Sequence, residues 1–172
     1  DLMLAVDVSG SMEALDFKLE GQPANRLDVV KSVVSKFIDA RSNDRIGLVG
    51  FAGAPYLVSP LTLDHDWLQQ NLDRVQIGTV EDGTAIGSAL ATSVNRLREQ
   101  PSKSKIVVLL TDGQNNAGKV MPDTAAQAAK DNDAEQLAKQ AKAQQEVAEA
   151  IERLDAPAAR TEQRAAEAAA EQ

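Results

Sequence analysis

The fold is decided by residues 2–11, which read LMLAVDVSGS. The stretch begins as a short apolar run and ends in small polar side chains, the pattern of a buried β-strand that leads into a loop. Two further strands are predicted at Ile46–Phe51 and Ile106–Leu110. The last one is apolar on both faces, which is typical of a central parallel strand covered by helices on each side.

Helical patterns separate these strands, because apolar residues recur at spacings of three and four. The predicted helices run from Asn25 or Arg26 to Ile38, around residues 68–75, and over residues 84–98. A turn at residues 53–55 is expected to return the chain as an antiparallel edge strand at residues 56–58. Strands that alternate with helices predict an α/β fold with a doubly wound, mostly parallel sheet.

Composition excludes several classes of function. The 172 residues are enough for one domain with a sizeable core. A net charge of −8 argues against nonspecific binding to nucleic acid or to anionic membranes. The chain has no Cys, which excludes disulfides, thiolate metal sites and a Cys nucleophile. No apolar run reaches the roughly 20 residues that span a bilayer. Because the chain opens inside a strand pattern without Met, we expect it to be part of a longer protein.

The character of the chain changes near Lys130. Residues 1–130 have the Gly and Pro punctuation of an α/β domain, whereas residues 131–172 contain no Gly, one Pro, and 14 Ala among 42 residues. The second region carries five Lys or Arg and ten Asp or Glu, a net charge of −5. We therefore predict a domain over residues 1–130 and a helical or solvated tail over residues 131–172.

Three polar segments lie where a strand ends or a helix begins. They are Asp7-Val8-Ser9-Gly10-Ser11, Asp82-Gly83-Thr84 and Thr111-Asp112-Gly113. In open α/β sheets, ligands bind at the carboxyl ends of the strands, so the three segments are expected to converge there. Residues 16–25 are expected to form a mobile loop beside them.

Hydroxyl and carboxylate oxygens, without nitrogen or sulfur, favour a hard cation such as Mg²⁺. Among the five candidate ligands only Asp7 and Asp112 carry charge, so the cation would stay electrophilic and could accept one more anionic oxygen. Two structural readings compete: Thr84 as the N-cap of its helix and Asp112 as a turn residue before Gly113.

The order and spacing of these residues resemble the metal-ion-dependent adhesion site of the von Willebrand factor type A family. The resemblance implies that Ser9, Ser11 and Thr84 bind the metal directly, and that Asp7 and Asp112 contact it directly or through water. The implied cation is Mg²⁺, with Mn²⁺ and Ca²⁺ as alternatives. The implied partner is a protein that supplies an Asp or Glu side chain.

The sequence around these residues is similar to that of bacterial Bat-type aerotolerance proteins. The similarity is clearest at residues 7–12, 45–51 and 82–87, which read DVSGSM, RIGLVGF and DGTAIG. That resemblance covers about residues 1–130. It implies a parent protein anchored in a bacterial inner membrane and associated with a MoxR-type AAA+ ATPase system.

The sequence departs from the family after Lys130, where the last two strands of the family's sheet have no counterpart. We therefore expect Ile106–Leu110 to become an unprotected edge strand, which invites pairing with another chain. Our hypothesis is that the tail helix covers part of this edge, or that a homodimer forms through the edge or the tail.

The function predicted from the sequence is a noncatalytic, Mg²⁺-dependent protein-interaction module, not an enzyme. No Walker loop is present, because Ile86-Gly87-Ser88 lacks the required Gly-Lys-Ser/Thr ending. Two alternatives are kept. One is a Mg²⁺-dependent phosphotransferase in which Asp7 attacks phosphorus, and the other is a scaffold whose metal site is idle.

Overall fold

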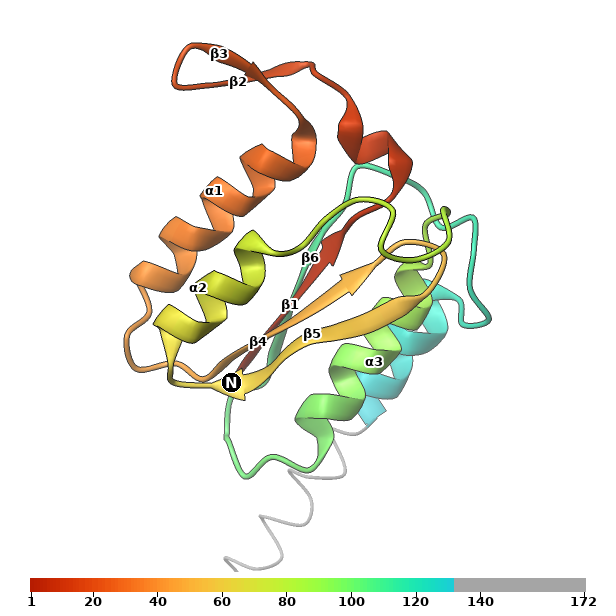
Figure 1. Ribbon diagram of the computed structural model, residues 1–172. Coiled ribbons are helices and arrows are strands. Elements are labelled where there is room, and N and C mark those ends of the chain that lie inside the picture. Colours follow the sequence, from red (N-terminus) through yellow and green to blue (C-terminus); the bar gives the residue numbers. More distant parts are fainter. Residues whose placement is uncertain (132–172) are drawn as a thin grey trace, which may run out of the picture. The chain divides into compact units, whose positions relative to one another are not determined.

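Four strands form the main sheet of the computed structural model, which describes residues 1–131 (Figure 1). The strands are β1 (Leu2–Asp7), β4 (Ile46–Phe51), β5 (Pro55–Thr62) and β6 (Ile106–Leu110). Their order in the sheet is β5-β4-β1-β6. Strand β1 is parallel to both of its neighbours, and β5 is antiparallel to β4. The mostly parallel α/β sheet and its antiparallel edge strand are therefore confirmed, although this strand already begins at Pro55 and is longer than the predicted residues 56–58.

Helices cover both faces of this sheet. They are η1, a short 3-10 helix (Gly10–Glu13), α1 (Arg26–Asp39), α2 (His65–Asp73) and α3 (Ile86–Arg98). Residues 122–131 are also helical. Helices α1 and α2 lie on one face of the sheet and α3 lies on the other (Figure 1). Side-chain caps fix the starts of α1 and α2, because Asn25 accepts the Asp28 N–H at 2.7 Å and Asp64 accepts the Trp67 N–H at 3.0 Å.

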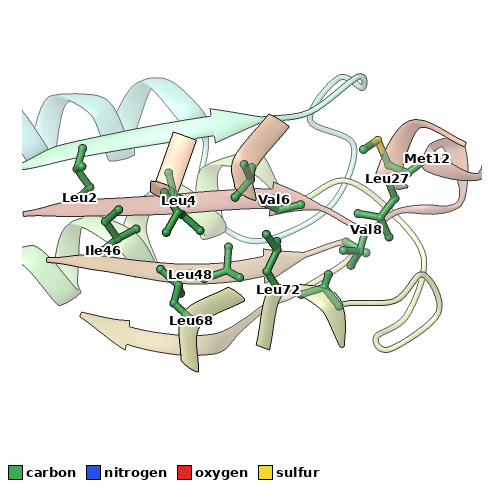
Figure 2. Packing of buried hydrophobic residues seen from close by; sticks show 14 residues of the cluster. Leu2, Leu4, Val6, Val8, Met12, Leu27, Ile46, Leu48, Leu68 and Leu72 are labelled. Carbon is green, nitrogen blue, oxygen red and sulfur yellow. The ribbon is translucent and has the colours of Figure 1, made fainter. Parts of the chain in front are cut away.

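Alternate residues of β1 pack against opposite layers. Leu2, Leu4 and Val6 lie in one cluster with buried residues of β4, α1 and α2 (Figure 2). Met3 and Ala5 lie in the clusters to which α3 contributes. All six residues of β1 are buried, which requires helices on both faces of the strand. Packing on both sides therefore fixes the position at which β1 ends and the polar loop begins.

Strand β6 is not central in the part of the chain that the structure describes. Its strand neighbour there is β1, and the prediction of a central position is wrong because no further strand within residues 1–131 pairs with its other side. Ile106 is 47% exposed and the rest of the strand is half-buried. The expectation that β6 forms a sheet edge holds for these residues, whereas a covering tail helix would lie outside them.

Helix α3 begins at Ile86, two residues later than predicted. Its N-cap is Ala85, so the reading of Thr84 as N-cap is wrong. The physical reason lies just before the helix. Gly83 has a positive φ of 133°, and the backbone N–H and C=O of Thr84 are bound by Asn116 in a non-helical turn.

The segment expected to be a loop, residues 16–25, contains a two-stranded hairpin. Its strands are β2 (Phe17–Leu19) and β3 (Gln22–Ala24), which pair antiparallel. The two connecting residues, Glu20 and Gly21, both have positive φ, 52° and 83°. Positive φ at both positions is the backbone of a type I′ turn, which matches the twist of hairpin strands.

Residues Asp1–Ala129 form one compact unit. The boundary predicted near Lys130 and the helical nature of residues 131–172 stay predictions, because nearly all of that region lies outside the described residues.

Candidate functional site

Two of the three predicted segments, the one after β1 and the one after β6, meet where these strands end. The register of these parallel strands pairs Val6 with Leu110. The next residues, Asp7 and Thr111, therefore lie opposite each other. The Thr111 hydroxyl donates to Oδ2 of Asp7 at 2.6 Å. Thr111 also accepts the Gly113 N–H on Oγ1 at 3.1 Å, so one hydroxyl shapes the second loop and joins it to the first.

Asp7 is fully buried, with 0% of its surface exposed. Its Oδ1 accepts the backbone N–H of Ser9 at 2.9 Å, and its Oδ2 accepts the Thr111 hydroxyl. A buried carboxylate is costly unless it is hydrogen-bonded or paired with a positive charge. Both of its oxygens are bound, so Asp7 serves as the internal support of the two loops.

Three oxygen-bearing side chains follow one another above Asp7. The hydroxyls of Ser9 and Ser11 lie 3.0 Å apart, and the Ser11 hydroxyl donates to Oδ1 of Asp112 at 2.8 Å. Ser9 is the N-cap residue of η1, yet its side chain makes no capping hydrogen bond. Its hydroxyl is therefore directed to Ser11, and the two loops present a continuous row of oxygen atoms.

Thr84 reaches the same place from the remaining segment, Asp82-Gly83-Thr84, which forms the third loop of the site. It is 4% exposed, and a Cβ placed on Gly113 would lie 3.3 Å from the Thr84 hydroxyl oxygen. The Thr84 N–H donates to the side chain of Asn116 at 2.8 Å, and its C=O accepts the Asn116 N–H at 3.1 Å. All five residues predicted as metal ligands thus lie on loops that contact one another, although their role as ligands stays a prediction.

Asp82, from the same segment, ties the third loop to the first. Its Oδ1 accepts the Gly10 N–H at 2.8 Å. Hydrogen bonds from the backbone N–H groups of Gly10 and Gly83 lower the pKa of its carboxyl below the ordinary value. A Cβ on Gly10 would lie 3.2 Å from Oδ2 of Asp82, so the close approach of the loops favours glycine at this position.

Arg26 is the residue that sequence reasoning missed. It is the first residue of α1, and its guanidinium forms ion pairs with both Asp16 and Asp112. Burial alone would raise the pKa of the Asp112 carboxyl. The hydrogen bonds from Arg26 and Ser11 and the positive charge of Arg26 outweigh burial and lower that pKa. A single Arg at the start of a helix belongs to no motif, and its partners become apparent only in the folded chain.

A cleft of about 470 Å³ opens beside Asp112. It is lined by side chains of η1, β2, α1 and the end of β6, together with the loops beside them. These residues are Met12, Asp16, Phe17, Arg26, Val29, Val30, Leu110, Thr111 and Asp112. The row of oxygen atoms therefore borders, at Asp112, a largely apolar cleft that Arg26 helps to line.

The donor set fits Mg²⁺. The converging atoms are hydroxyl and carboxylate oxygens, which this cation prefers. Six oxygens at about 2.0–2.1 Å from Mg²⁺ in an octahedron lie about 2.9 Å apart along each edge. The Ser9–Ser11 and Ser11–Asp112 oxygen pairs, at 3.0 Å and 2.8 Å, have this spacing. Within residues 1–131 no three His, Cys, Asp or Glu side chains gather around one point, so a cation here depends on hydroxyl donors.

Residues 2–114 match the family described as von Willebrand factor type A domain. An uncharacterized protein of Borreliella burgdorferi is 32% identical over 123 residues, which are 72% of this chain and 35% of that protein. The chain thus spans about a third of the length of the curated relatives it matches.

Solved structures agree with this match. An aerotolerance-related membrane protein from Bacteroides fragilis superposes with a TM-score of 0.67 at 30% identity, covering 76% of this chain and 61% of that one. An uncharacterized membrane-spanning protein from Vibrio fischeri gives 0.54 at 46% identity, covering 76% and 64%. Within residues 1–131, no helix combines the length and the hydropathy needed to cross a bilayer. Domains of this type are commonly protein-interaction modules and are generally not enzymes.

Proposed function

The chain belongs to the von Willebrand factor type A family, and we propose that it is a noncatalytic interaction module that grips an Asp or Glu side chain of a partner protein through Mg²⁺. The observation that carries this proposal is the row of oxygens from Ser9, Ser11 and Asp112 at the ends of β1 and β6. These oxygens lie at the place where open α/β sheets bind ligands.

The roles proposed for the side chains differ with their charge and burial. Ser9, Ser11 and Thr84 would bind the cation as neutral donors, and Asp112 would contribute a carboxylate oxygen. Asp7, buried beneath them, would hold the loops in position and supply the second negative charge. When bound, Mg²⁺ would act as a Lewis acid with a position open to one carboxylate oxygen from outside. The small number of charged donors in the chain would leave that position attractive to an anion.

The burial of Asp7 argues against the phosphotransferase alternative. A nucleophilic carboxylate must reach the phosphorus atom of its substrate. Asp7 is 0% exposed, with Oδ1 bound by Ser9 and Oδ2 bound by Thr111. An attack by Asp7 would require breaking one of these hydrogen bonds and opening the loop above it.

The partner is proposed by class. By its likeness to proteins described as membrane proteins, we infer that the parent protein is anchored in a bacterial inner membrane. A MoxR-type AAA+ ATPase system is the associated machinery that we propose from the Bat-type likeness. A second copy of this chain, paired through the edge of β6, is the other partner that the sheet could accept.

The experiment that tests the proposal is a calorimetric titration of the full, metal-free chain with Mg²⁺ and with Mn²⁺, beside Asp112→Ala. We expect saturable binding of one cation per chain, lost in Asp112→Ala. Asp66→Ala is the matched control, because it removes an exposed carboxylate from α2 and should leave the binding unchanged.

Failure of the titration would be informative. Absence of cation binding by a chain that circular dichroism shows to be folded would reject the proposal, and the scaffold with an idle site would replace it. Binding that survives Asp112→Ala would reject this location for the cation. Turnover of a small phosphodonor with phosphorylation of Asp7 would favour the enzyme instead.

A further inference from the structure

Arg26 bridges two carboxylates that come from different parts of the chain. Its Nε lies 3.1 Å from Oδ1 and 3.0 Å from Oδ2 of Asp16, which precedes the β2–β3 hairpin. Its Nη1 contacts Oδ2 of Asp112, which follows β6. One guanidinium thus connects α1, the hairpin and the loop that carries the predicted ligand.

The carboxylate of Asp112 is divided between two surroundings. Oδ1 accepts the Ser11 hydroxyl at 2.8 Å and faces the row of oxygens, whereas Oδ2 is bound by Arg26. The oxygen available to a cation is therefore Oδ1, and a fixed positive charge lies on the other side of the same carboxylate. Arg26 does not need to leave when Oδ1 takes another partner.

We propose that Arg26 is a positioning residue that holds the Asp112 carboxylate and lowers the affinity of the site for Mg²⁺, so that an acidic partner is needed to complete tight binding. This inference rests on the proposed function of the same site. The single negative charge of Asp112 faces both the cation and Arg26, so it neutralises neither completely. The remaining positive charge attracts an incoming carboxylate. Arg26 lines the cleft beside Asp112, and its side chain is 30% exposed, so its own charge also faces that cleft.

Electrostatics gives the size of the effect. A unit charge about 6 Å from a dication changes the affinity for that cation about tenfold, even at the dielectric constant of water. Asp16 acts in the opposite direction, because its carboxylate partly cancels the charge of Arg26. Loss of Arg26 alone should therefore tighten Mg²⁺ binding, and loss of the Asp16 charge alone should weaken it.

The test is a calorimetric Mg²⁺ titration at low ionic strength of the full chain and its variants. The variants are Arg26→Gln, Arg26→Lys, Asp16→Asn and the Arg26→Gln/Asp16→Asn pair. We expect Arg26→Gln to bind Mg²⁺ about tenfold more tightly and Asp16→Asn to bind it several-fold more weakly, with the pair closer to the wild type. Arg26→Lys keeps the charge and should stay within about threefold of the wild type. The difference between the wild type and Arg26→Gln should shrink as salt is raised, since exposed charges are screened.

The outcomes separate the inference from the proposed function. If the wild type binds Mg²⁺ and Arg26→Gln binds it equally or more weakly, the inference falls and the proposed function stands. If neither protein binds Mg²⁺, both fall. If Arg26→Gln does not fold, Asp16→Asn decides, because an unchanged or tighter affinity there overturns the inference.

Discussion

The Thr111 hydroxyl donates to Oδ2 of Asp7 across 2.6 Å and so joins the carboxyl ends of two neighbouring parallel strands, β1 and β6. Asp7 is the last residue of its strand and is fully buried. The loop of Ser9 and Ser11 and the loop of Asp112 are therefore held together by a contact beneath the site. Their relative position depends on this hydrogen bond as well as on the sheet.

Replacement of that hydroxyl should be costly. Thr111→Val keeps the shape of the side chain but leaves the buried Oδ2 of Asp7 without this donor, and we expect a loss of about 1–3 kcal/mol of unfolding free energy. Urea unfolding of the metal-free chain measures this loss. Thr111→Ser retains the hydroxyl and should lose distinctly less. Equal stability of the Val variant and the wild type would contradict the supporting role of this hydrogen bond.

Acid should remove the stabilising effect of the Asp16–Arg26 ion pair. The hydrogen bonds and charge of Arg26 lower the pKa of the Asp16 carboxyl below its ordinary value. A carboxyl whose pKa is lower in the folded than in the unfolded chain stabilises the fold at pH values above its unfolded pKa, which is about 4. This contribution is lost as the pH falls through the folded pKa.

The corresponding measurement compares the urea unfolding of the metal-free wild type with that of Asp16→Asn from about pH 7 down to about pH 2. The wild type should be the more stable protein above about pH 5, and the difference should vanish at the acid end. In the background of Arg26→Gln the Asp16→Asn substitution should have little pH-dependent effect. A difference that persists at the lowest pH would show that the effect is not electrostatic.

The first strand and its loop were predictable because their signals are local. The apolar run of β1, the small polar residues after it and the alternating spacing of Asp7, Ser9 and Ser11 lie within a few positions of one another. Thr84 and Asp112 could be added because parallel strands bring their carboxyl ends to one edge of the sheet. The structure brings these loops together, while cation binding by them stays a prediction.

The contacts of Arg26 could not be predicted, because they depend on distance in space rather than in sequence. Asp16 is 10 positions and Asp112 is 86 positions away from it. The start of α3 was placed too early for a similar reason. The turn that delays it is held by Asn116, which lies 32 positions after Thr84. Apolar periodicity contains no information on such contacts.

The turn of the β2–β3 hairpin offers a stabilising substitution. Glu20 has a φ of 52°, a conformation that Asn adopts more readily than Glu, and Asn-Gly is the preferred pair in a type I′ turn. Glu20→Asn should raise the unfolding free energy by roughly 0.5 kcal/mol. Gly21→Ala, at a φ of 83°, should have the opposite sign. Urea unfolding of both variants tests the pair, and the same sign for both would contradict the assigned turn.

Gly87 should be intolerant of any side chain, because the segment between β6 and the last described helix crosses it. A Cβ there would lie 1.9 Å from the carbonyl oxygen of Val120 and 2.6 Å from the carbonyl carbon of Met121. These are backbone atoms, so Gly87→Ala must displace the segment that also carries Asn116, the residue that holds Thr84 in place. We expect a loss of about 1–3 kcal/mol of unfolding free energy, and weaker Mg²⁺ binding by the protein that still folds.

Asn95→Ala, an exposed position on the same helix, is the control and should change neither quantity. If Gly87→Ala matched this control in both measurements, the segment would be too loosely packed to position Thr84, and the third loop would have no fixed place in the site.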